Sequence, residues 1–186
     1  APAKFVLVEL DFPQRKELAA KTKAQNKKLQ EQYGIQGYPS ILLLDSQGKL
    51  YARTGYRKGG PEAYLKHLDE LQQVKSARQK LLAEADKAKG VERARLLDQF
   101  ITEGAKGDLE PEDDSEQVRE IVQLDSDNKA GLKAKYQKIL TDFEVKQALQ
   151  ACVRKAVAKQ FKEATADVDK AITQYQLAGE DPQKAL

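Results

Sequence analysis

One short stretch restricts the fold of this chain more than any other, because it combines turn-forming residues with two apolar runs. Gly34 stands where a helix C-cap is expected. Pro39, which has no backbone N–H, directly precedes the apolar run Ile41–Leu44. The turn-forming residues Asp45–Gly48 follow, and Lys49–Thr54 then alternates between apolar and polar side chains. The stretch predicts a helix end, a turn and a β-hairpin.

Three further elements are expected around this hairpin. The apolar, β-branched run Phe5–Glu9 predicts a buried strand that ends before Pro13. A narrow apolar stripe among many charged residues predicts a helix over Glu17–Tyr33. Pro61 is typical of a helix start, and apolar residues recur after it at helical spacing: Tyr64, Leu65, Leu68 and Leu71. The expected order is strand, helix, hairpin, helix.

From Val74 onward the apolar residues recur at intervals of three and four, which predicts helices only. Gly90 is expected to separate two of them, and Gly104–Pro111 to form a loop. Another helix is expected from about Lys129. The pattern beyond it fits one long helix or two helices that bend near Thr141.

A further helix is expected over Lys162–Leu177 and a last helix start at Asp181-Pro182, which we interpret as an unfinished helix. The predicted fold class is therefore α+β or α/β: a partial sheet followed by an all-helical region. The corresponding domains are 1–72 and 73–186.

Composition narrows the classes of function. The chain has 186 residues, of which 40% are hydrophobic and 33% charged, as in a folded, soluble protein. Its net charge of +3 comes from 32 basic and 29 acidic residues that are interspersed along the chain. This dispersal argues against nucleic acid binding. No apolar run approaches the roughly 18 residues of a membrane span.

Residues 33–71 resemble the second half of a thioredoxin domain, and the resemblance extends over residues 4–71. The matching positions are Gly34, Gly37, Pro39, Gly48 and Gly55, with Ser40 in place of the usual Thr. Asp11-Phe12-Pro13 after an apolar strand is similar to larger bacterial thioredoxin-like proteins with helical extensions. The resemblance implies a periplasmic or secreted protein.

The resemblance also implies a site. The Tyr38–Pro39 peptide bond would be cis, and Tyr38, Pro39 and Ser40 would bind a protein or peptide substrate. No catalytic residue is expected within the chain, because the family's Cys-x-x-Cys pair is absent and Cys152 lies on an apolar helical stripe, where a buried side chain is expected. We expect no cofactor and no metal, since His67 is the only histidine and lies on a helix without a nearby cysteine.

In the family's sheet, the strand that leads to the cysteine pair lies between the strands matching Phe5–Glu9 and Ile41–Leu44. Its absence leaves three alternatives. A segment outside this sequence supplies the strand, the Phe5 strand pairs directly with Ile41–Leu44, or a second copy of the chain supplies the partner strand in a homodimer. We favour the first.

Two functions remain open. The chain is part of a thiol-disulfide oxidoreductase of the bacterial envelope and is redox-inactive without the cysteine pair. Alternatively, it is a non-catalytic protein interaction module that uses the Tyr38–Ser40 edge and the helical region. That region faintly resembles tetratricopeptide helix hairpins, without a strict repeat. The acidic run Glu110–Glu116 is expected to be a solvated loop before a helix.

Overall fold

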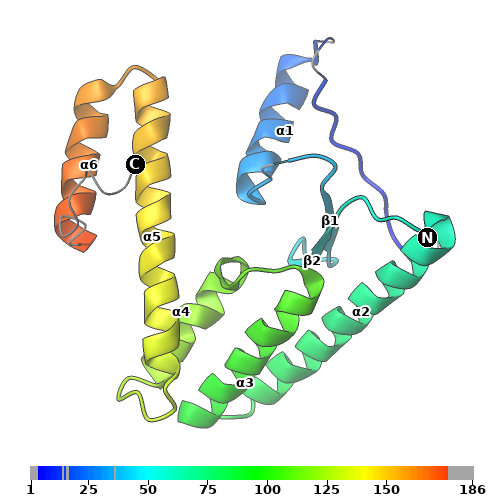
Figure 1. Ribbon diagram of the computed structural model, residues 1–186, viewed down its shortest axis with the longest axis vertical. Coiled ribbons are helices and arrows are strands. Elements are labelled where there is room, and N and C mark those ends of the chain that lie inside the picture. The colour runs from blue at the N-terminus through cyan, green and yellow to red at the C-terminus, as the bar shows by residue number, and fades with distance from the viewer. Residues whose placement is uncertain (1–3, 14, 16, 36, 176–186) are drawn as a thin grey trace. The chain divides into compact units, whose positions relative to one another are not determined.

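The computed structural model describes residues 4–13, 15, 17–35 and 37–175 (Figure 1). The chain divides into two compact units, Ala1–Lys75 and Ser76–Leu186. The first contains a two-stranded antiparallel sheet with helices and the second is helical, so the predicted fold class is confirmed. The domains 1–72 and 73–186 stay a prediction. Helix α2 (Gly60–Ala85) runs without a break past the predicted boundary at residue 72 and past the boundary between the two units at Lys75.

The β-hairpin of the first unit is the one that the sequence predicts. Strand β1 (Ile41–Leu44) pairs with β2 (Leu50–Thr54), and Ile41 lies opposite Thr54. One carboxylate oxygen of Asp45 accepts hydrogen bonds from the backbone N–H groups of Gln47 and Lys49, both at 2.9 Å. These bonds satisfy the turn donors within the loop, which explains why the local sequence suffices to define it. Helix α1 (Ala20–Gln32) precedes the hairpin.

The predicted strand Phe5–Glu9 is wrong. This segment forms no strand, and the side chains of Val6, Leu7 and Val8 are 92%, 75% and 78% exposed. Only Phe5 packs against the small core of the unit, which consists of Leu43, Tyr51, Ala52, Leu68 and Leu71. A strand needs a neighbour for its backbone groups, and among the described residues β1 pairs only with β2. Direct pairing of Phe5–Glu9 with β1 is therefore not observed.

The second unit continues α2 and adds further helices. They are α3 (Gly90–Gly104), the 3₁₀ turns η1 (Ala105–Gly107) and η2 (Pro111–Asp114), α4 (Ser115–Leu124), α5 (Leu132–Val157) and α6 (Phe161–Tyr175). The break at Gly90 is confirmed, and its φ of 56° is a conformation that glycine adopts without strain. Helix α5 continues through Thr141, so the single long helix is correct. Leu177 and Asp181-Pro182 lie outside the described residues.

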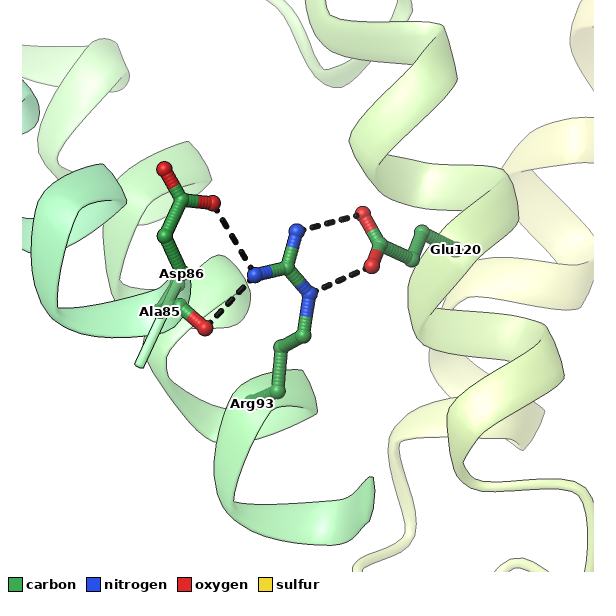
Figure 2. Close-up of polar contacts among 4 residues, drawn as sticks. All are labelled: Ala85, Asp86, Arg93 and Glu120. Atoms are coloured by element: carbon green, nitrogen blue, oxygen red, sulfur yellow. Dashed lines mark hydrogen bonds and ion pairs between the residues drawn. The ribbon is translucent and has the colours of Figure 1, made fainter. Parts of the chain in front are cut away.

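Arg93 joins three helices of this unit. Its guanidinium donates to Glu120 on α4 at 2.5 and 3.2 Å, to the backbone oxygen of Ala85 at 2.6 Å and to Asp86 at 3.0 Å (Figure 2). The hydrogen bond to Glu120, followed by that to Asp86, raises the pKa of Arg93 above its ordinary value. The buried core beside it includes Leu97, Phe100, Val118, Ile121 and Tyr136.

The acidic run Glu110–Glu116 is not wholly solvated, which corrects the sequence expectation. Asp114 is buried, and both of its carboxylate oxygens accept from Nη2 of the equally buried Arg78 at 2.6 Å. A buried carboxylate is stable only with such a partner. The ion pair of Asp114 with Arg78 therefore links η2 to α2.

Candidate functional site: the segment before strand β1

The segment Gly37–Ser40 leads directly into β1, and all four of its residues are exposed. The Tyr38–Pro39 peptide bond is cis. The hydroxyl of Ser40 donates to the backbone oxygen of Gly37 at 2.6 Å. This hydrogen bond closes a tight loop around Tyr38 and Pro39.

The side chain of Tyr38 is held in place by two other segments. Its ring lies 5.3 Å from that of Phe12, centroid to centroid, at an interplanar angle of 39°. Its hydroxyl accepts a hydrogen bond of 3.0 Å from Nε2 of Gln30 on α1. The side chain is nevertheless 60% exposed. An exposed aromatic ring that is already held in one orientation loses little conformational entropy when it binds a partner.

The loop after β2 closes on the same segment at Gly55. A Cβ atom at this position would lie 2.9 Å from the backbone oxygen of Pro39, which is closer than real Cβ contacts allow. Only glycine therefore permits this approach. The resemblance included Gly55 among its matching glycines, and the structure shows the contact that requires it.

Hydrogen bonds also fasten helix α1 to the residues around the site. Nδ2 of the buried Asn26 donates to the backbone oxygen of Asp11 at 2.8 Å, which positions the segment that carries Phe12. Nη1 of Arg53 donates to the backbone oxygen of Tyr33 at 2.8 Å. Sequence reasoning missed the roles of Gln30 and Asn26, since nothing in a polar, lysine-rich helix distinguishes one amide from another. It also missed the role of Phe12, because the contact of its ring with Tyr38 joins positions 26 residues apart.

Strand β1 offers one edge for further pairing. It is paired along its other edge with β2, and no third strand is present among the residues that the structure describes. The side chains of Ile41 and Leu44 are 39% and 38% exposed. Such an edge can accept an extended chain, because its N–H and C=O groups are arranged for pairing.

The sequence also singled out His67 and Cys152. Nε2 of His67 lies 2.9 Å from Oγ1 of Thr54, and Arg57 lies 3.0 Å from the same ring. Partial burial and then the nearby Arg57 lower the pKa of His67 below its ordinary value. Cys152 is buried on α5 in the second unit, as predicted. No group of three metal-ligating side chains occurs in the described part of the chain.

Comparisons with known proteins relate the first part of the chain to one family. Residues 2–72 match the thioredoxin-like domain family. A relative described as disulfide bond reductase DsbH, from Chlamydia pneumoniae, is 37% identical over 59 residues, which are 32% of this chain and 36% of the relative. The match therefore spans only about a third of that relative's length. No solved structure gave a significant match.

The family match over residues 2–72 includes the β-hairpin and ends within helix α2. The tetratricopeptide-like character of the helical unit stays a prediction. None of the described helices is both long enough and apolar enough to cross a membrane.

Proposed function

We propose that residues 2–72, a thioredoxin-like segment, belong to a thiol-disulfide oxidoreductase of the bacterial envelope. In this proposal Tyr38, Pro39 and Ser40 contact the protein substrate, and a segment outside the 186 residues supplies the Cys-x-x-Cys pair. One observation carries it: the exposed Gly37–Ser40 segment leads into a strand with an unpaired edge among the described residues.

The chemistry explains this division of roles. Thiol-disulfide exchange begins when a thiolate attacks a disulfide sulfur, and a second thiol then resolves the mixed disulfide. Cys152 is buried, and a buried thiol cannot reach a substrate disulfide. The 186 residues would therefore supply the surface that holds the substrate, through backbone hydrogen bonds beside Pro39 and contact with the ring of Tyr38. The relative is described as a disulfide bond reductase, which supports the same reaction class.

An insulin reduction assay tests the proposal on two forms of the protein. The 186-residue chain should show no turnover, and the full-length protein should reduce insulin. In the full-length protein, Tyr38→Ala should raise KM about tenfold with little change in kcat, since the ring binds substrate without reacting. Phe161→Ala is the matched control, because Phe161 is a similarly exposed aromatic residue in the other unit.

Two results would contradict this function. Turnover by the 186-residue chain that disappears in Cys152→Ala would assign the chemistry to Cys152. A full-length protein without a cysteine pair would favour the alternative function, a non-catalytic module that binds peptides at Tyr38–Ser40. In that case Tyr38→Ala should weaken peptide binding in a direct titration.

A further inference from the structure

An apolar stripe lies exposed on the helical unit. Leu149, Val153 and Val157 on α5 are 44%, 62% and 79% exposed, and Phe161 at the start of α6 is 63% exposed. Residues four apart lie on the same side of a helix, so the three α5 side chains form a continuous row. The row ends where α5 and α6, which lie side by side, are joined by a short turn (Figure 1).

Basic residues flank this stripe, and the acidic residues Glu163 and Asp167 on α6 lie near one of them, Lys155. Residues 146–162 contain five basic residues and no acidic one: Lys146, Arg154, Lys155, Lys159 and Lys162. Lys155 forms an ion pair with Asp167. The other four have no ion pair with a carboxylate in the described part of the chain.

The helix dipole accounts for the positions of only some of these basic residues. Arg154 and Lys155 lie in the last turn of α5, where the helix dipole favours positive charge. Lys162 lies in the first turn of α6, where the dipole disfavours it. Val157 and Phe161 beside it expose apolar surface to water, which favours a partner that covers it. Exposed apolar side chains beside four cations that have no ion pair among the described residues favour a partner that is both apolar and anionic.

We propose that the end of the α5–α6 hairpin binds an anionic lipid bilayer. Val153, Val157 and Phe161 enter the boundary between headgroups and acyl chains, and the basic residues contact lipid phosphates. A bilayer fits better than an acidic helix of a partner protein, because Val157, the most exposed residue of the stripe, lies at the hairpin end, where a flat surface meets both helices. This inference is independent of the thiol chemistry proposed above.

Vesicle co-sedimentation of the 186-residue chain tests this surface. The vesicles are pure phosphatidylcholine or contain about 30% phosphatidylglycerol, at about 50 mM and about 500 mM salt. The charge variant is Lys146→Glu with Lys162→Glu, and its matched control is Lys66→Glu with Lys80→Glu, two exposed lysines on α2. The apolar variant is Val157→Ser with Phe161→Ser, and its control is Tyr56→Ser at another exposed aromatic residue. Circular dichroism checks that every variant is folded.

The chain should bind anionic vesicles and not neutral ones, and high salt should weaken binding. Each basic residue near an anionic surface strengthens binding about fivefold, so the charge variant should bind at least about tenfold more weakly. The apolar variant should also bind about tenfold more weakly, and both controls should bind like the wild type.

Three results would overturn the inference. The first is no binding to anionic vesicles at low salt, or equal binding by the charge variant and its control. The second is a dimer in light scattering that the apolar variant abolishes, which would make the stripe an interface between two copies. The third is binding of an acidic amphipathic peptide to the stripe without binding of vesicles.

Discussion

Arg78 and Asp114 form an ion pair whose side chains are only 4% and 2% exposed. The guanidinium carbon of Arg78 also lies 4.0 Å from the ring centroid of Phe100. A buried pair of this kind adds little net stability compared with apolar residues of similar size, but removal of one partner leaves an uncompensated buried charge. Its contribution is therefore best measured through single and double variants.

We expect Asp114→Ala to lower the free energy of unfolding by about 3–5 kcal/mol, because Arg78 stays buried without a counter-charge. The double variant with Arg78→Met should lose less than the two single variants summed. Urea denaturation measures all three. Lys106→Met, which breaks an exposed pair with Glu103, is the control and should cost under about 0.5 kcal/mol. An equally small loss in Asp114→Ala would contradict this account.

Asp125 is the second buried carboxylate that shapes the helical unit. Its oxygens accept from the backbone N–H groups of Ala130, Leu132 and Lys133 at 2.9, 2.8 and 3.1 Å, which satisfies free donors where α5 begins. These hydrogen bonds, that from Ala130 first, lower the pKa of Asp125 below its ordinary value. Folding is therefore favoured by the ionised form.

This lowered pKa predicts a loss of stability in acid. The contribution of Asp125 is present above the unfolded-state pKa of about 3.9 and is lost as the pH falls through the lower folded-state pKa. Asp125→Asn should be less stable at neutral pH and should depend less on pH below about 4. Urea midpoints at several pH values measure this, with Asp142→Asn, on the exposed Asp142 of α5, as control. Parallel pH profiles for wild type and Asp125→Asn would show that Asp125 is not responsible.

At the scale of elements, the contact between Gly55 and Pro39 couples the end of the hairpin to the segment before β1. Gly55→Ala should cost about 1–3 kcal/mol, because its Cβ would meet the Pro39 backbone oxygen at 2.9 Å. Hydrogen exchange measured by mass spectrometry should show faster exchange over residues 38–44. Gly37→Ala is the control, since a Cβ there meets nothing within 4 Å. Unchanged exchange in Gly55→Ala would mean that the loop simply moves away.

The elements that the sequence predicted correctly are those defined by local interactions. The bounds of β1 follow from a proline before it and a turn after it, and Gly90 ends a helix through its own backbone conformation. Phe5–Glu9 has the composition of a strand, but it forms one only beside a partner, which the described residues do not supply. The pairing of Arg78 with Asp114 joins positions 36 residues apart, and no local sequence pattern predicts it.

The candidate site also combines residues that the local sequence predicts with residues that it does not. Tyr38, Pro39 and Ser40 were recognisable because they lie in one short motif with flanking glycines. The residues that hold Tyr38 in place come from elsewhere in the chain, Phe12 from the segment before α1 and Gln30 from α1 itself. Such contacts depend on how α1 packs, which the sparse apolar stripe of that helix does not determine.

At the scale of the whole molecule, the two units differ in how much apolar surface each buries. Among the described residues, the core of the first consists of five buried residues and that of the second of nine. In the first unit Val6, Leu7 and Val8 are also exposed. Since burial of apolar side chains is the main stabilising term, the first unit should be the less stable one.

We therefore expect the units to open at different urea concentrations, although α2 is shared between them. Hydrogen exchange of the 186-residue chain in increasing urea should show loss of protection over residues 20–54 before residues 94–121. The part of α2 before Lys75 should exchange with the first group and the part after Ser76 with the second, because each half packs on a different core. Ala94→Gly, at a buried position of α3, should lower only the second midpoint. A single midpoint for all peptides would instead show that α2 couples both units into one cooperative structure.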